Sequence, residues 1–240
     1  HIAEKLPADP TETFTLVVDA DKRQKIANNH TCTHLLDEVL REVLGTHVEQ
    51  KGSYVCDNYL RFDFSHFEKL TEEQIRLVER KVNALIRANH PLEEKRDASM
   101  DEAKAMGAIA LFGEKYGDVV RVVKFGDSVE LCGGCHTSAT GNIGFFKINT
   151  ESAIAAGIRR IEAMTGSDAE FIVDAMENTI RIAKSFFNNA PDLLGAIKKL
   201  VEDNDAYKKQ MNEIIKEKTA ALKRDLAGKA VVIEGRNVIR

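Results

Sequence analysis

The sequence predicts an α+β fold, in which helices surround a mostly antiparallel sheet and an antiparallel helical hairpin follows. Up to Gly166, short segments of alternating or β-branched apolar residues are separated by glycine turns, which is typical of strands. Segments between these strands have apolar residues at three- and four-residue spacing, which indicates amphipathic helices. After Gly166 the strand patterns give way to two longer helical patterns.

The composition is that of an ordinary globular protein. The 240 residues are 43% hydrophobic and 30% charged, which argues against disorder. The net charge of −4 means that any contact with nucleic acid must come from local basic patches. The four cysteines are too few for a disulfide scaffold and favour a reducing compartment. Because the sequence begins without methionine and has no long apolar run, we expect a soluble, cytoplasmic segment of a longer protein with no membrane partner.

The first elements follow from local patterns. A β-branched run over residues 14–19 predicts a strand, and a helix over residues 21–44 ends at Gly45. Strands over 48–56 and 59–64 predict a hairpin with its turn at Asp57-Asn58.

Two capping patterns then mark helix starts. Thr71-x-x-Gln74 opens a helix that must stop near His90, because Pro91 follows, and Ser99-x-x-Glu102 opens a shorter one. Further strands are predicted over residues 119–125, 129–131, 143–148 and 157–163.

The region after Gly166 predicts the helical hairpin. Ser167-x-x-Glu170 is the pattern of a cap, and apolar residues recur at helical spacing before Asn188 and after Pro191. We interpret this hairpin as a packing arm or a self-association element, with RNA binding through its lysines as the alternative. The predicted organisation is a linker with an entry strand (1–19), a domain (20–166), the hairpin (167–228) and the first strand of a further domain (229–240).

Two distant segments together predict a metal site. His30 and His34 are four residues apart, so both imidazoles project from one face of a helix. In the segment Cys132-Gly133-Gly134-Cys135-His136, the glycines permit a sharp turn that brings a thiolate and an imidazole together. His30, His34, Cys132 and His136 supply the nitrogen and sulfur ligands that suit one zinc ion. Cys135 is the alternative to Cys132 as the thiolate ligand.

Five motifs stand in the same order as in a known family. They are His30-Thr31-Cys32-Thr33-His34-Leu35-Leu36, His47-Val48-Glu49-Gln50-Lys51-Gly52-Ser53, Arg61-Phe62-Asp63-Phe64-Ser65-His66, Cys132-Gly133-Gly134-Cys135-His136 and Gly157-Ile158-Arg159-Arg160-Ile161-Glu162. On these motifs, residues 20–166 resemble the editing domain of the alanyl-tRNA synthetase family, and the hairpin resembles the connector that follows it. The family more often has a small residue at Cys32 and a threonine at Cys135.

The resemblance implies hydrolysis of the ester that joins serine or glycine to the 3′ end of tRNA(Ala). It also implies that the full-length enzyme attaches alanine to this tRNA, with ATP and Mg²⁺ used by an N-terminal domain absent from this sequence. Whether zinc activates water or only positions the substrate is left open by four candidate ligands.

The resemblance further assigns roles to polar residues near the ligands. Thr33 and Gln50 match the positions that recognise the serine hydroxyl, a task suited to hydrogen-bonding groups. Arg61 and Asp63 either contact the nucleotide or form a surface pair, and Arg159 and Arg160 are predicted to bind phosphates unless one pairs with Glu162. The alternative functions are a non-catalytic, zinc-stabilised module for tRNA binding or oligomerisation, and a stand-alone trans-editing hydrolase.

Overall fold

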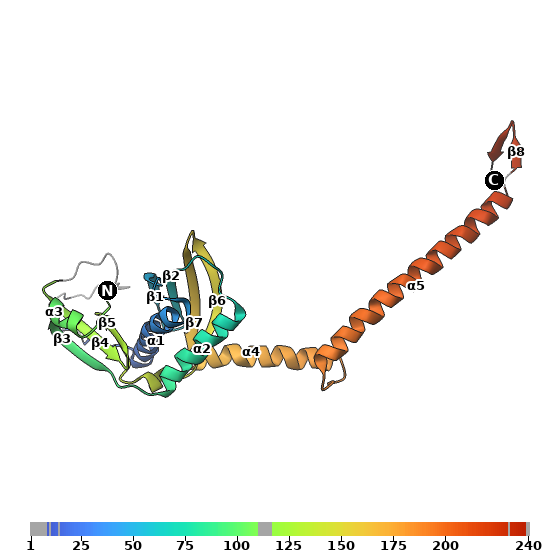
Figure 1. Ribbon diagram of the computed structural model, residues 1–240. Coiled ribbons are helices and arrows are strands. Elements are labelled where there is room, and N and C mark those ends of the chain that lie inside the picture. The colour runs from blue at the N-terminus through green and yellow to red at the C-terminus, as the bar shows by residue number, and fades with distance from the viewer. Residues whose placement is uncertain (1–8, 10, 14, 110–116, 230, 239–240) are drawn as a thin grey trace. The chain divides into compact units, whose positions relative to one another are not determined.

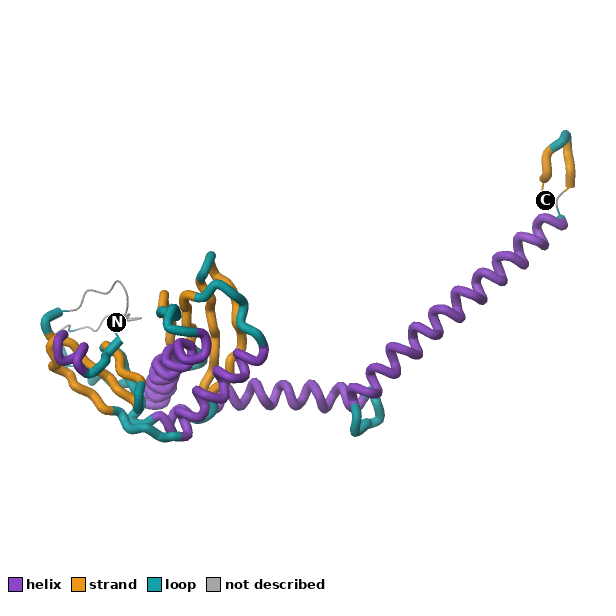
Figure 2. Tube along the Cα trace, viewed as in Figure 1, coloured by secondary structure: helices purple, strands orange, loops and turns teal. Residues whose placement is uncertain are grey.

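The computed structural model describes residues 9, 11–13, 15–109, 117–229 and 231–238, and the chain divides into two units, 1–175 and 176–240 (Figures 1 and 2). The helices are α1 (Ala20–Leu44), α2 (Glu72–Arg87), α3 (Met100–Ala105), the 3-10 helix η1 (Thr140–Ile143), α4 (Gly166–Ser185) and α5 (Leu193–Gly228). The strands are β1 (Gln50–Val55), β2 (Leu60–Ser65), β3 (Glu93–Ser99), β4 (Val119–Phe125), β5 (Ser128–Leu131), β6 (Phe146–Ala155), β7 (Ile158–Thr165), β8 (Val231–Ile233) and β9 (Arg236–Val238). Helices and antiparallel sheets confirm the predicted α+β class.

Helix α1 forms the centre of the first unit. The Asp19 side chain caps it by accepting a hydrogen bond from the backbone N–H of Lys22. It ends at Gly45, whose φ of 117° is open to glycine and strained for other residues. As Figure 1 shows, α1 lies between two sheets, and it contacts β1, β2 and β7 on one side and β5 on the other.

Both sheets are antiparallel. The larger sheet has the order β1-β2-β7-β6, and the smaller one has the order β3-β4-β5. The predicted hairpin of β1 and β2 is confirmed, with Val55 paired to Leu60. Phe62 and Phe64 of β2 are fully buried, as are Leu35 and Leu36 of α1, in one core that also takes in α2. Because the apolar side chains of α1 are packed in this core, the positions of its polar side chains are fixed as well.

One strand prediction is wrong, and the start of another is misplaced. Phe14 lies outside the described residues, and Thr15–Asp19 form no strand. Leu16, Val17 and Val18 are exposed there, and no strand in the described part of the chain pairs with them. The strand predicted over 143–148 begins only at Phe146, because η1 occupies its start and Gly144 takes a φ of 77°, which interrupts extended backbone.

The two helices predicted after Gly166 both form. Helix α4 begins at Gly166, so Ser167 lies inside the helix and the predicted cap there is wrong. Asp192 caps α5 by accepting a hydrogen bond from the backbone N–H of Gly195. The described part of α5 buries no residue, and Leu200 and Met211 are more than half exposed. The antiparallel arrangement of these two helices stays a prediction.

Strands β8 and β9 form a short antiparallel hairpin where one strand was predicted. None of the helices in the described part of the chain combines the length and apolar character needed to span a bilayer.

The capping box at Thr71 gives a first testable prediction. The Thr71 hydroxyl accepts a hydrogen bond from the N–H of Gln74, and the Gln74 side chain accepts one from the N–H of Thr71. Thr71→Ala removes one of these bonds and should lower the free energy of unfolding by about 1 kcal/mol in urea denaturation. Thr71→Ser keeps the hydroxyl and should match the wild type; equal loss in both variants would contradict a capping role.

Candidate metal centre

Helix α1 presents two imidazoles on one face. His30 and His34 are one helical turn apart, and their ring centroids are 5.4 Å apart in an edge-to-face arrangement. His34 is buried and His30 is half-buried. The predicted geometry, with both rings projecting from one face, is therefore present.

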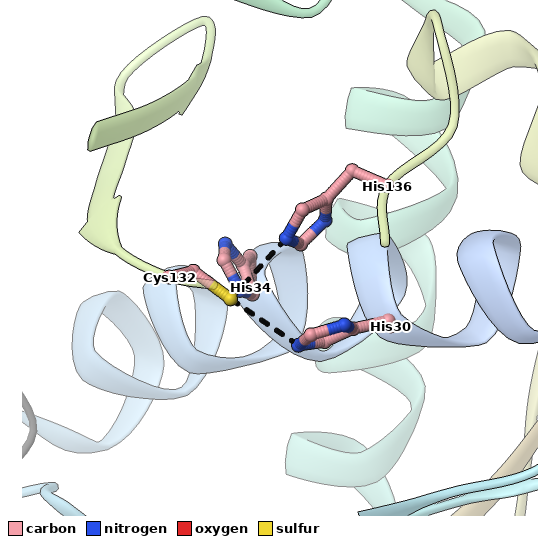
Figure 3. A group of neighbouring side chains, drawn as sticks. All are labelled: His30, His34, Cys132 and His136. Atoms are coloured by element: carbon pink, nitrogen blue, oxygen red, sulfur yellow. Dashed lines mark hydrogen bonds between the residues drawn. The ribbon is translucent and has the colours of Figure 1, made fainter. Parts of the chain in front are cut away.

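The loop after β5 supplies the other two side chains. The Sγ of Cys132 lies 3.5 Å from Nε2 of His30 and 3.3 Å from Nε2 of His136, as the dashed lines in Figure 3 mark. One donor atom from each of His30, His34, Cys132 and His136 can be chosen so that all lie within 4.8 Å of one another. The structure thus brings together the four residues predicted from spacing.

The other cysteines lie outside this group. Cys135 is not among the converging donors, and its backbone forms a hydrogen bond with the ring of His30. Cys32 is fully buried in the core, where burial raises the pKa of its thiol. Cys56 is half-buried at the turn after β1, with its Sγ 3.5 Å from the carbonyl of Tyr59.

Each of the three imidazoles has a polar partner outside the group of four. The ring of His30 bonds the backbone of Cys135, and Nδ1 of His136 lies 3.1 Å from the hydroxyl of Thr31. For His34, Nε2 lies 3.4 Å from a carboxylate oxygen of Glu130, and Nδ1 is buried without a hydrogen-bond partner among the described residues. Partners of this kind fix ring orientation in metal sites, and the buried, unpartnered nitrogen of His34 is what an ion would satisfy.

The electrostatics keep the three imidazoles neutral. Burial lowers the pKa of His30, lowers that of His34 well below its ordinary value, and, with the nearby His30 and Arg121, lowers that of His136 to about 3. Neutral imidazole is the form that binds metals, so no proton has to be displaced from these rings near neutral pH.

The two glycines of the loop have different roles. A Cβ atom on Gly134 would lie 1.9 Å from Cε1 of His30, whereas a Cβ on Gly133 would meet nothing within 4 Å. Neither glycine takes a positive φ, so the sharp turn predicted for this loop does not use the left-handed backbone that glycine adopts most readily. Gly134 is required because the ring of His30 lies directly against the loop.

An arginine that the sequence did not single out holds the loop in place. Arg121 of β4 donates from Nη1 to the carbonyls of Cys132 (3.2 Å) and Gly134 (2.6 Å). Its Nε and Nη2 bind Glu94 of β3 at 2.9 and 2.6 Å. Because β3 was not predicted, no sequence signal placed Glu94 beside Arg121.

The residues predicted to recognise the substrate lie as follows. Thr33 is buried next to the histidines, and its hydroxyl donates to the carbonyl of His30 at 2.7 Å. Gln50, at the start of β1, is half-buried, and its amide donates to Ser53 at 3.3 Å. Neither is among the donors of the metal group.

The predicted nucleotide-binding residues form ion pairs on the larger sheet. Arg160 donates to both carboxylate oxygens of Asp63, at 2.6 and 2.8 Å, and Arg61 lies 3.8 Å from the same carboxylate. The side chain of Asp63 is buried, so its pair with Arg160 is not the surface pair considered from the sequence. Arg159 is buried and pairs with Glu151, not with Glu162.

The donor set fits zinc. One thiolate and three neutral imidazoles give four soft or borderline ligands, the usual number and type for a tetrahedral zinc site, and no carboxylate is among the converging donors. The unpartnered Nδ1 of His34 gives independent support for a bound cation.

The contact between Glu130 and His34 gives a second prediction. Burial, with Asp37 and Glu38 nearby, raises the pKa of Glu130 to about 8. Glu130→Ala should lower the affinity for zinc by about 10–100-fold, because it removes the group that orients His34. Glu130→Gln keeps a hydrogen-bonding group there and should cost less; competition with a chromophoric chelator measures both. Identical affinity in Glu130→Ala and wild type would show that Glu130 does not orient His34.

Comparison with known proteins relates the chain to alanine–tRNA ligases. The model of the "Threonyl and Alanyl tRNA synthetase second additional domain" matches residues 120–162, which include Cys132 and His136. Alanine–tRNA ligases of Bacteroides fragilis and Bacteroides thetaiotaomicron are each 56% identical to the chain over 240 residues, and that of Cytophaga hutchinsonii is 47% identical over 242. These alignments cover 100% of the chain but only 28% of each relative. Along its whole length, the chain is thus homologous to one segment of the alanine–tRNA ligases.

Proposed function

We propose that this chain carries a zinc-dependent hydrolytic site that removes serine and glycine wrongly attached to tRNA(Ala). The observation that carries the proposal is the convergence of His30, His34, Cys132 and His136 in a segment homologous to alanine–tRNA ligases. Residues 20–166 are the proposed editing domain. The joining of alanine to tRNA, with the ATP and Mg²⁺ that the resemblance implies, is proposed for residues outside this sequence.

The chain's own side chains would prepare the ester for attack by water. His30, His34, Cys132 and His136 would hold the ion, and Arg121 and Glu130 would keep the loop and one imidazole in place. A bound zinc ion supplies Lewis-acid polarisation and electrostatic stabilisation of developing negative charge. The burial of the cluster strengthens these interactions, because water screens them less there.

Selection against alanine requires recognition of one hydroxyl. Thr33 and Gln50 are proposed to make that contact, since a hydrogen-bonding site discriminates far better than an apolar pocket. The hydroxyl of Thr33 donates to a backbone carbonyl, which leaves its lone pairs to accept a hydrogen bond from a substrate hydroxyl.

Contact with tRNA is proposed to extend beyond the ester. Arg61, Asp63, Arg159 and Arg160 stay predictions as nucleotide contacts. The ion pairs of Arg61 and Arg160 with Asp63, and of Arg159 with Glu151, would have to open, or the arginines would present only their remaining N–H groups. Self-association through α4 and α5 likewise stays a prediction, supported by their exposed apolar residues.

A non-catalytic zinc module is the second candidate. Four protein donors meet in the cluster, and closed four-ligand sets are typical of structural zinc sites, whereas catalytic sites keep one position open. In that case zinc would only join α1 to the loop after β5.

Deacylation separates the two candidates. The zinc-loaded chain is incubated with Ser-tRNA(Ala) and with Ala-tRNA(Ala), and release of each amino acid is followed with and without a chelator. The proposal predicts faster release of serine than of alanine and loss of that difference with the chelator. Zinc-loaded protein that binds tRNA(Ala) but releases both amino acids at the uncatalysed rate would support the structural module.

A further inference from the structure

A cavity of about 640 Å³ adjoins the metal centre. Its wall is made by the first turns of α1, by side chains of β3 and β4, and by the loop of residues 133–136. His136 lines the cavity and also belongs to the metal group, so the two are continuous. The volume is within the range of sites that bind small molecules or parts of larger ones.

Three arginines from three different elements line this cavity. They are Arg23 of α1, Arg96 of β3 and Arg121 of β4, and no carboxylate is among its described lining residues. The cavity is therefore a local basic patch on a chain whose net charge is −4, which is what contact with nucleic acid requires here.

The three guanidinium groups differ in the hydrogen bonds and ion pairs that they already form within the chain. Arg121 is partly buried and bound to Glu94 and to two loop carbonyls. Arg96 pairs with Glu94 at 2.7 Å, but its side chain is 77% exposed, and such surface pairs exchange at little cost. Arg23 is exposed and has no side-chain hydrogen bond or ion pair within the described residues, so its charge is available to a ligand.

Arg23 is aligned with the metal ligands along α1. Arg23, Ala27, His30 and His34 follow one another at steps of four, three and four residues, which places them on one face of the helix. Arg23 and His30 are two turns apart, or about 10 Å along the axis. An anion held by Arg23 would therefore lie near the centre without contacting it.

We propose that Arg23, assisted by Arg96, binds a phosphodiester group near the 3′ end of the RNA whose terminal ester lies at the metal centre. This inference rests on the proposed function and adds the part of the substrate that the cavity holds. A guanidinium group matches the geometry of a phosphate through two parallel hydrogen bonds. Ala20, Ala27, Gly133 and Gly134 also line the cavity, and their small size leaves room for a ribose beside the phosphate.

Binding of uncharged tRNA(Ala) to the zinc-loaded chain, measured by fluorescence anisotropy at several salt concentrations, tests the inference without any catalysis. Arg23→Ala should weaken binding by about 10-fold and reduce the slope of log Kd against log salt by about one. Lys25→Ala is the matched control, because it removes the same charge from the same helix but Lys25 does not line the cavity and pairs with Asp168. An Arg23→Ala variant with the affinity and slope of the Lys25→Ala variant would overturn the inference.

Hydrolysis then separates this inference from the proposed function. Arg23→Ala should reduce the preference for Ser-tRNA(Ala) over seryl-adenosine, which has no phosphodiester, by about 10-fold. If the wild type hydrolyses both substrates and Arg23→Ala keeps the full preference, the phosphate site is wrong and the editing function stands. If the wild type hydrolyses neither, yet Arg23→Ala loses affinity for tRNA, the editing function is wrong and the phosphate site stands.

Discussion

Cys132→Ala is expected to lose zinc completely on gel filtration, whereas Cys135→Ala is expected to retain it. The Sγ of Cys132 lies within 3.5 Å of two imidazole nitrogens, and Cys135 contributes only its backbone to the same surroundings. The thiolate supplies the one negative charge among the four donors, so its removal weakens the site more than loss of a neutral ligand would. Elemental analysis of the purified variants measures the bound zinc.

The two variants are matched, since each exchanges a half-buried cysteine for alanine in the same loop. Circular dichroism with thermal melting shows whether the metal-free Cys132→Ala variant is folded. Zinc retained by Cys132→Ala and lost by Cys135→Ala would reverse the ligand assignment.

Gly134→Ala is expected to lower the affinity for zinc on the order of 100-fold, while Gly133→Ala leaves it near the wild-type value. The added methyl group at position 134 would lie 1.9 Å from Cε1 of His30, so the ring must move away from Cys132. At position 133 the methyl group meets nothing within 4 Å. Competition with a chelator gives both affinities, and the deacylation rate for Ser-tRNA(Ala) should fall with zinc occupancy.

Both glycines have φ values open to alanine, so neither variant strains the backbone and the comparison isolates the contact with His30. Equal zinc affinity in Gly133→Ala and Gly134→Ala would mean that the ring of His30 does not lie against the loop as described.

The elements that sequence predicted best are those set by local chemistry. The caps at Thr71 and Ser99 mark helix starts wherever the rest of the chain lies, because the hydrogen bonds involve residues three apart. Strand β3 escaped prediction because only Ala98 in it is buried and its charged residues pair with the neighbouring strand, as Glu93 does with Lys124. For residues 15–18 the error was the opposite one, a strand predicted where none forms. Apolar side chains alone do not make a strand without a neighbouring strand to pair with.

At the metal centre, too, local patterns were predictable from the sequence and contacts between distant segments were not. The four donors were predictable because helical spacing joins His30 to His34 and a short loop joins Cys132 to His136. The groups that support these donors were not predictable. Thr31 and Glu130 contact residues about a hundred positions away, and Arg121 reaches from β4 to the loop after β5, so no local sequence pattern indicates these contacts. The position of Arg23 in the cavity could not be predicted either, because the cavity is formed by several elements that come together only in the folded chain.

X-ray absorption at the zinc edge of the zinc-loaded chain tests the metal centre most directly, because the proposed hydrolysis depends on the identity of the four ligands. The account predicts one sulfur at about 2.3 Å and three nitrogens at about 2.0–2.1 Å. A shell with two sulfurs would place Cys135 beside Cys132 on the metal, and a shell without sulfur would contradict the centre described here.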